Sequence, residues 1–200
     1  VDMALALTMP ALTGAFLGAW VAGGMDWLRF AFTAAGVLSI AVAYQAYVAV
    51  GDVRQSLLPH ARPTADLPDT AFAALVGGVL PLPLVMSLAH LLTVLGVVCG
   101  LWLALLAGWP VLFFGALSLL LLGASFAPPV RYAYRGWGVG EVGVSLGLGL
   151  LPLISAYYSQ AQNLSWLPVM AGLPIVLLSL WILLAQNLGS RRRDWLMDKR

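Results

Sequence analysis

Residues 84–127 read LVMSLAHLLTVLGVVCGLWLALLAGWPVLFFGALSLLLLGASFA, and no Asp, Glu, Lys or Arg interrupts them. A helix needs about 20 apolar residues to cross a bilayer, so this stretch is long enough for two crossings. The sequence Gly108-Trp109-Pro110 divides it, because Gly and Pro mark the ends of helices more often than their interiors. We therefore predict a helical hairpin in a membrane, with helices at 84–107 and 109–127 and a tight turn at 108–110.

The composition of the whole chain agrees with that hairpin. Of its 200 residues, 62% are apolar and only 9% are charged, and the mean hydropathy is +0.94. Soluble domains carry about 25% charged residues, so the class of water-soluble proteins is excluded. The single cysteine, Cys99, rules out an intrachain disulfide. No basic segment precedes the first apolar run, so a cleavable signal peptide is not expected, and neither is a nucleic-acid partner.

Apolar runs of spanning length also lie on both sides of the hairpin. They are continuous rather than alternating, which favours transmembrane helices over strands. We predict an all-α polytopic membrane bundle that forms one domain over 1–200. Residues 51–69 are polar and contain proline, which indicates a loop. Residues 70–83 are ambiguous and could form a short surface helix that ends at Pro81 and Pro83. The six spans are placed near 4–25, 28–50, 84–107, 109–127, 140–158 and 167–186.

The basic residues predict the orientation of these spans. In a six-span arrangement, nine of the ten Lys and Arg residues fall on one side, and Arg29 alone lies near the other. Because cytoplasmic loops are enriched in Lys and Arg, we expect both termini in the cytoplasm and the protein in the cell's inner (cytoplasmic) membrane. Interfacial tryptophans are expected at the opposite ends of the spans. They are Trp20, Trp27, Trp109 and Trp166.

Polar side chains also gather at the predicted cytoplasmic ends. Gln45 lies late in the second span, Glu141 opens the fifth, and Asn187 closes the sixth. Polar groups are costly in lipid, so these residues could line one cavity open to the cytoplasm, or each could be an ordinary interfacial residue. Neither His60 nor His90 has a second His or Cys at metal-binding spacing.

Two glycine patterns indicate close helix packing. Gly14 and Gly18 are one helical turn apart, a spacing that lets two helix backbones approach each other. The run VSLGLGL at 144–150 indicates either a close helix contact or a path for a lipid tail.

Four short stretches are similar to the sequence of one known family. They are Gly108-Trp109, the loop 126–136, Gly138-Val139-Gly140-Glu141 and Tyr157-Tyr158-Ser159-Gln160. Through them, and over nearly its whole length, the chain resembles the UbiA prenyltransferase superfamily, and within it most closely the 1,4-dihydroxy-2-naphthoate polyprenyltransferases. The resemblance implies a helical bundle of nine spans, of which this sequence carries the first six.

The resemblance also implies a reaction. Two Asp-rich motifs, after spans 2 and 6, hold Mg²⁺ on a polyprenyl diphosphate, and the metal stabilises the leaving diphosphate while an aromatic acceptor attacks. The first motif, N-x-x-N-D-x-x-D, corresponds to 45–52, where Ala49 replaces an Asp and Asp52 is retained. The second, N-N-x-R-D-x-x-x-D followed by G-K-R, corresponds to 186–200, where Ser190 replaces an Asp and Asp194 is retained.

These correspondences define the candidate site. Asp52 and Asp194 are the candidate Mg²⁺ ligands, and they have that role only if the chain is an enzyme. The candidate substrate-binding or lipid-binding residues are Gln45, Asp52, Arg54, Tyr132, Arg135, Glu141, Asn187, Asp194, Lys199 and Arg200.

Two functions follow from the altered motifs. The loss of acids favours a non-catalytic descendant that binds a quinone, a carotenoid, another isoprenoid lipid or a pigment, or that serves as a subunit of a larger membrane complex. The alternative is an active Mg²⁺-dependent polyprenyltransferase of menaquinone-type biosynthesis, since substrate phosphates supply further metal ligands. The expected partners are membrane lipids and other membrane subunits.

Overall fold

The computed structural model describes the backbone of residues 2–56, 81–126 and 139–196. Side chains are described at most of these positions, but not at residues 186–196 or at several other helix ends, including Asp52 and Arg54. Within these ranges the chain is helical throughout, with short turns and no strand. The predicted fold class, an all-α polytopic membrane bundle, is confirmed.

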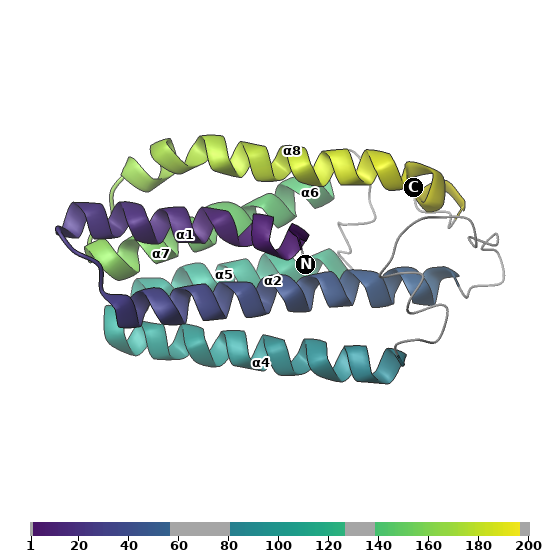
Figure 1. Ribbon diagram of the computed structural model, residues 1–200, viewed down its shortest axis with the longest axis horizontal. Helices are drawn as coiled ribbons and strands as arrows, with labels where there is room; N and C mark the ends of the chain where they lie inside the picture. Colours follow the sequence, from purple (N-terminus) through teal and green to yellow (C-terminus); the bar gives the residue numbers. More distant parts are fainter. Residues whose placement is uncertain (1, 57–80, 127–138, 197–200) are drawn as a thin grey trace.

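The described residues make six passes along one axis, each antiparallel to the one before (Figure 1). The fifth pass is a continuous rod in which a π-helical segment, η2, separates α6 from α7. Five passes contain a stretch long and apolar enough to cross a membrane, and α5 contains a shorter apolar stretch, Trp109–Ser125. The elements are α1 (Asp2–Ala22), α2 (Trp27–Ser56), α4 (Leu82–Ala107), α5 (Trp109–Phe126), α6 (Val139–Val144), η2 (Ser145–Leu150), α7 (Leu151–Ala161) and α8 (Leu167–Leu196).

The two ends of the bundle differ in character. At the turn end, short turns at 23–26, 108 and 162–166 join the helices (Figure 1). At the opposite end, the motif end, α2, α5 and α8 finish, and α4 and α6 begin. Of the basic residues whose backbone is described, four lie in the last turns of α2 and α8 at the motif end, and Arg29 lies at the turn end.

The predicted hairpin is confirmed, and its turn is one residue long. Gly108 adopts φ 106°, a left-handed conformation that favours glycine, and its N–H donates to the Ala104 carbonyl over 2.7 Å. Pro110 lies in the first turn of α5, where a missing N–H costs no helical hydrogen bond. Gly and Pro thus act at the positions where their backbone properties suit a turn between two helices.

Three predicted boundaries were wrong. Residues 51–56 continue α2 rather than opening a loop, because Val53 is buried against Ala49, Leu82 and Val85. The span placed at 140–158 runs on to Ala161, and the span placed at 4–25 ends at Ala22, before the turn at Gly23 and Gly24. The span placed at 167–186 agrees with the apolar stretch Leu167–Ala185, and its helix continues beyond that stretch to Leu196.

Small residues form the interior of the bundle. Alanine is the most frequent residue among the buried hydrophobic positions, while many Leu, Trp and Phe side chains are exposed. A Cβ added to Gly14 would overlap the Leu153 carbonyl, and one added to Gly18 would overlap that of Tyr157. The close-packing face predicted from the Gly14–Gly18 spacing is thus the contact of α1 with α7. Helices in a bilayer gain stability from such close approach, because lipid already solvates their large apolar side chains.

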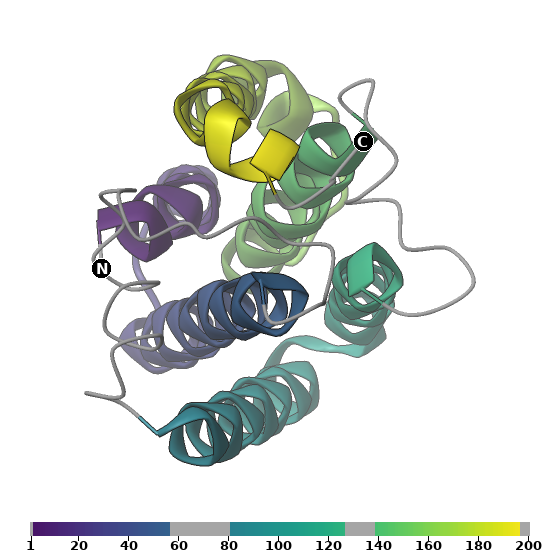
Figure 2. The same ribbon diagram turned by 90° about the vertical axis from the view of Figure 1, so that its right-hand side faces the viewer.

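The passes are arranged in layers (Figure 2). Viewed along the bundle, α8 and α4 lie at opposite sides, and between them lie α1 with the α6–α7 rod, and then α2 with α5. In the α4 span 17% of residues are buried, against 56% in the span Gly140–Ala161, so the α6–α7 rod is central and α4 is peripheral. Helix α4 packs mainly on α2, where Gly36 and Gly96 face each other.

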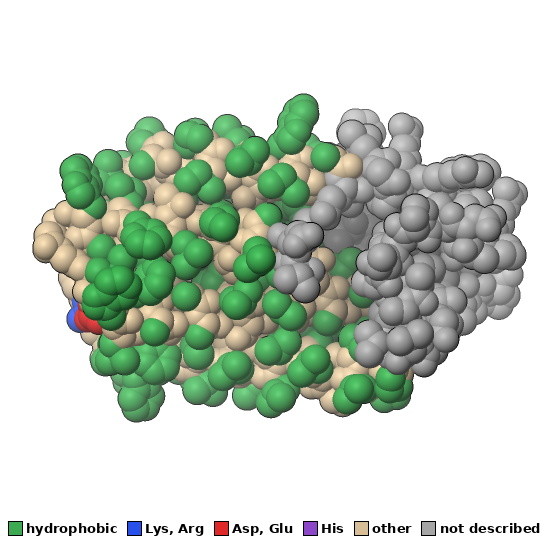
Figure 3. All heavy atoms as spheres, viewed as in Figure 1, with side chains coloured by type: hydrophobic (Ala, Val, Ile, Leu, Met, Phe, Trp, Pro, Cys, Tyr) green, Lys and Arg blue, Asp and Glu red, His purple; other side chains and the backbone are tan. Residues whose placement is uncertain are grey.

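The outer surface is that of a protein embedded in lipid. Hydrophobic side chains cover the face seen in Figure 3, and the charged atoms visible on it lie at the turn end. Among the side chains that the structure describes, only Asp26, Arg29 and Glu141 are charged. The predicted interfacial tryptophans all flank the turns of the turn end, with more than two thirds of each side chain exposed. They are Trp20, Trp27, Trp109 and Trp166.

Candidate functional site

Two of the predicted site residues have side chains that the structure describes. Gln45 on α2 and Glu141 on α6 are both half-buried. Helix α6 packs against α5, η2 and α8, whereas α2 packs mainly against α4 and α1. Helix packing by itself therefore does not bring Gln45 and Glu141 together.

The other predicted site residues are placed only by backbone or lie outside the described residues. Asp52 and Arg54 are in the last turns of α2, and Asn187 and Asp194 are in the C-terminal third of α8, so both helix segments end at the motif end (Figure 1). Their side chains are outside the described part. The remaining four, Tyr132, Arg135, Lys199 and Arg200, lie outside the described residues altogether.

No metal site is found in the part of the chain that the structure describes, since no three His, Cys, Asp or Glu side chains cluster there. His90 donates from Nδ1 to the Met86 carbonyl oxygen over 2.7 Å, and its ring packs edge-on against Tyr47. These contacts are local to α4 and α2.

The turn end holds a polar network centred on Arg29. Its guanidinium donates to the carbonyls of Ser159 and Leu106, both over 3.0 Å, and it pairs with the Asp26 carboxylate at 3.1 Å. Leu106 and Ser159 lie in the last turns of α4 and α7, where helix carbonyls lack intrahelical donors. A cation is also favourable there, since the helix dipole is negative at its C-terminus. One side chain thus caps two helices.

Asp26 and Gln160 extend this network across the α1–α2 turn. The Asp26 carboxylate accepts from the N–H groups of Leu28 and Arg29, which caps the start of α2. The Gln160 amide bonds both backbone groups of Asp26, at 2.9 and 3.1 Å. Gln160 is 5% exposed, so these bonds satisfy a polar group that is otherwise costly to bury.

Tyr157 closes the turn that follows α7. Its hydroxyl donates to Asn163 Oδ1 over 2.9 Å and accepts from Ser165 Oγ over 3.0 Å. The Tyr157–Gln160 stretch, which helped to suggest the family resemblance, therefore has a structural explanation in this fold. Its polar groups hold the turn end together.

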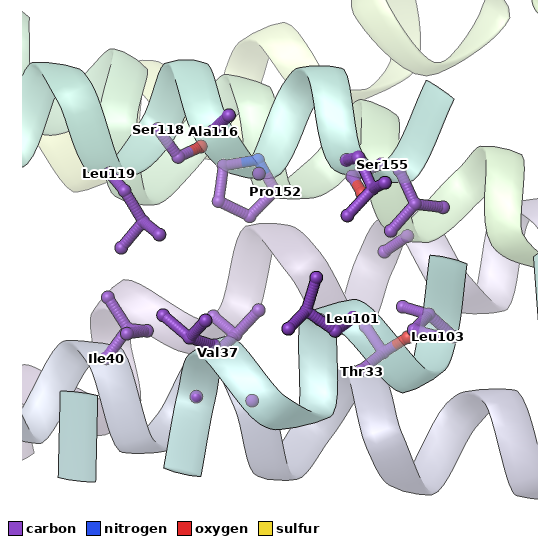
Figure 4. A pocket seen from close by; sticks show the side chains of 18 of the residues that line it. Thr33, Val37, Ile40, Leu101, Leu103, Ala116, Ser118, Leu119, Pro152 and Ser155 are labelled. Atoms are coloured by element: carbon purple, nitrogen blue, oxygen red, sulfur yellow. The ribbon is translucent and has the colours of Figure 1, made fainter. Parts of the chain in front are cut away.

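A cavity bordered by described residues lies between the helices of the bundle. It has a volume of about 290 Å³ and is bounded by α2, α4, α5, η2 and α7. Figure 4 shows its two facing sides, with Val37, Ile40 and Leu101 opposite Leu119 and Pro152. Leu101 and Leu112, which also line it, are about half exposed, so the cavity borders the outer surface between α4 and α5.

Glycines make this cavity possible. Gly100 and Gly115 both line it, and a Cβ added to either would meet no atom within 4 Å. On the inner side, η2 lies close to α5, since a Cβ on Gly147 would be 3.2 Å from Leu122 Cδ2 and 3.5 Å from the Ser118 carbonyl oxygen. The lining is therefore tight on the side of η2 and open towards α4 and α5.

The π-helical segment has a local cause in the sequence. Pro152 lacks an N–H, and its ring would clash with the carbonyl four residues earlier in a regular α-helix. The helix widens before it, and the Leu151 N–H donates to the Leu146 carbonyl five residues back. Such π-turns are frequent at functional sites. Here the turn places Gly147 and Pro152 on the cavity wall.

Three hydroxyl groups interrupt the apolar lining, from Thr33, Ser118 and Ser155. Thr33 donates to the Arg29 carbonyl in its own helix. Ser118 is 8% exposed, and its Oγ is the one buried side-chain polar atom without a hydrogen-bond partner among the described residues. Leaving a buried hydroxyl unpaired costs about 1–3 kcal/mol. No group among the described residues therefore supplies the hydrogen-bond partner that this atom needs.

The run VSLGLGL at 144–150 predicted either a close helix contact or a lipid path. The structure shows the close contact, between Gly147 and α5, and both Gly147 and Leu148 also line the cavity. The sequence did not predict that Ser118 and the glycines of α4 and α5 line the cavity. An isolated Ser or Gly in an apolar helix does not indicate which residues lie opposite it.

Comparison with known proteins gives no relative. No protein-family model, no curated protein and no solved structure matches this chain.

Proposed function

We propose that this chain is a multi-pass protein of the cytoplasmic membrane that binds an isoprenoid-class lipid in the cavity between α2, α4, α5 and α7, without catalysing its transfer. The observation that carries the proposal is the apolar cavity of about 290 Å³ bordered by the exposed Leu101 and Leu112. Ligand sites are typically apolar cavities of about 300–1,000 Å³ with few polar groups, and this cavity lies at the lower end of that range.

The altered motifs support a binding role over a catalytic one. Each motif retains one family-matched acid, Asp52 or Asp194, where Ala49 and Ser190 replace two others. Mg²⁺ in enzymes of this kind is held by carboxylates together with substrate phosphates, and losing one well-placed electrostatic group costs about two to three decades in rate. Two such losses leave little transferase activity. Further membrane subunits could cover the apolar outer faces, with both termini in the cytoplasm.

The alternative is an active Mg²⁺-dependent prenyltransferase. One observation favours it: α2 and α8, which carry Asp52 and Asp194, end at the same end of the bundle (Figure 1). An assay with an aromatic acceptor, a polyprenyl diphosphate and Mg²⁺ separates the two functions. Robust turnover that the Asp194→Ala variant loses would favour the enzyme, and no turnover above background is expected.

The binding proposal is tested by filling the cavity. We expect a photoreactive isoprenoid alcohol to label peptides of α4 and α5 saturably in lipid nanodiscs. The Gly115→Leu variant should reduce this labelling about tenfold or more, because the added side chain occupies open space beside the cavity lining.

Gly123→Leu is the matched control. Gly123 is also on α5 with no atom within 4 Å of an added Cβ, but it is exposed and does not line the cavity. Its labelling should equal that of the unmodified chain. Equal labelling of all three proteins, or labelling that never saturates, would refute binding in this cavity.

A further inference from the structure

Among the buried Ser and Thr residues that the structure describes, Ser118 is the exception in its hydrogen bonding. A Ser or Thr in an apolar helix usually donates to a carbonyl three or four residues earlier. Thr8, Thr33, Ser39, Ser125, Ser159 and Ser179 are buried and do so, and the buried Ser145 donates to Val176 on the neighbouring helix. Ser118 is equally buried, and its Oγ has no partner.

The position of Ser118 in the fold indicates where a partner for its hydroxyl group would have to lie. It lines the cavity from α5, on the same side as Pro152 and Ser155 (Figure 4). Ser118 is nine residues after Trp109, which places it about 13 Å along the helix and near the middle of a hydrocarbon core of about 30 Å. Water is scarce at that depth, so a polar group there must find its partner in the protein or in a ligand.

We propose that Ser118 donates a hydrogen bond to a carbonyl oxygen on the ligand of this cavity, so that the ligand is an apolar molecule with a ketone or quinone group rather than a pure hydrocarbon. The proposal rests on the proposed function and names the ligand class of the same site. The ester carbonyls of phospholipids are the other source of such an oxygen, but they lie at the membrane surface rather than near the bilayer centre. A quinone-type ring that partitions into the core can reach Ser118 through the opening between α4 and α5.

The alternative view of the same cavity is a slot for hydrocarbon alone. A site built only for hydrocarbon gains nothing from an unpaired hydroxyl, since such a group loses its hydrogen bonds whenever an apolar chain covers it. A site that pairs the hydroxyl with a ligand oxygen discriminates against the analogue that lacks this oxygen, because the serine is then left unsatisfied. The two views therefore predict different effects of Ser118 on the binding of two ligands that differ only in their carbonyl groups.

The experiment compares a prenylated naphthoquinone with the matching prenylated naphthalene, which lacks both carbonyl groups. Each competes with the photoreactive isoprenoid alcohol in nanodiscs of ether-linked phosphatidylcholine, which has no ester carbonyl. We expect Ser118→Ala to weaken competition by the quinone about three- to tenfold and to leave the naphthalene unchanged. Ser118→Thr retains the hydroxyl and should preserve quinone binding.

An infrared measurement reports the bond itself. The carbonyl stretch of the bound quinone should move to lower frequency with the unmodified protein, and this shift should be absent with Ser118→Ala. The control is Ser125→Ala, since Ser125 lies on the same helix but is paired with the Leu122 carbonyl and does not line the cavity. It should change neither the competition nor the infrared band.

The outcomes separate the two proposals. If both competitors bind and Ser118→Ala weakens neither, or weakens both equally, the carbonyl contact is refuted while lipid binding in the cavity stands. A carbonyl shift that appears only in ester-linked lipid would assign the contact to phospholipid and refute the quinone-type ligand. If neither compound competes and the probe itself does not label saturably, the proposed function fails, and this inference fails with it.

Discussion

At the scale of single residues, the turn end depends on Arg29. Its guanidinium reaches carbonyls that are 77 and 130 positions away in the sequence, and it closes the ends of α4 and α7 at once. The Asp26 carboxylate beside it is 44% exposed, so this ion pair is weakened by solvent and contributes less than the two carbonyl contacts. Arg29 therefore acts mainly as a donor to backbone groups and only secondarily as an ion-pair partner.

We expect Arg29→Met to lower the free energy of unfolding by about 2–3 kcal/mol, because it leaves two helix-end carbonyls without their charged donor. Tryptophan fluorescence during reversible unfolding in mixed micelles measures this change. Asp26→Asn is the control, since it keeps an acceptor for the helix cap and removes only the exposed charge, at a cost of about 0.5 kcal/mol. Equal losses in the two variants would mean that the ion pair, and not the carbonyl contacts, dominates.

At the scale of elements, glycine decides which helices touch. Gly14 and Gly18 allow α1 to lie on the backbone of α7, and Gly36 and Gly96 allow α2 to lie on α4. Elsewhere glycine leaves room instead, as at Gly100 beside the cavity. The same residue type thus makes contacts in one place and space in another, according to what lies opposite.

Gly14→Ala and Gly18→Ala should each destabilise the protein by about 1–3 kcal/mol, because the new methyl group overlaps the backbone of α7 and must push the two helices apart. Unfolding in mixed micelles again provides the measurement. Gly123→Ala has open space at its Cβ, so it should be neutral or stabilise by up to about 1 kcal/mol through helix propensity. Destabilisation by the Gly123 variant as well would indicate that helix propensity, rather than the α1–α7 contact, is being measured.

At the scale of the whole molecule, the two ends of the bundle should face opposite sides of the membrane. The turn end has the exposed tryptophans and one basic residue, and the motif end continues into the basic segments. Lys and Arg favour the cytoplasmic side, so the motif end is expected there.

Cysteine labelling tests this orientation. In a Cys99→Ala background, an impermeant maleimide should react with the Ser56→Cys variant only in inverted membrane vesicles, and with the Leu164→Cys variant only in intact cells. Ser56 ends α2 at the motif end, and Leu164 is 59% exposed in the turn after α7. Reaction of both variants from the same side would contradict the six-pass arrangement, and a clean reversal would contradict the orientation alone.

The sequence by itself determined that this is a helical membrane protein, where its passes lie, and that Gly108 ends one helix before Trp109 begins the next. These features depend on local apolar length and on the backbone properties of Gly and Pro, which act within a few residues. The family resemblance and the motif residues remain predictions, and most of those residues lie where side chains are not described. Only the tertiary structure decided that α1 pairs with α7, that Arg29 caps two distant helices, and that Ser118 faces a cavity unpaired. Such features arise where residues far apart in the chain meet, and an apolar sequence in lipid carries little polar patterning to reveal which helices will be neighbours.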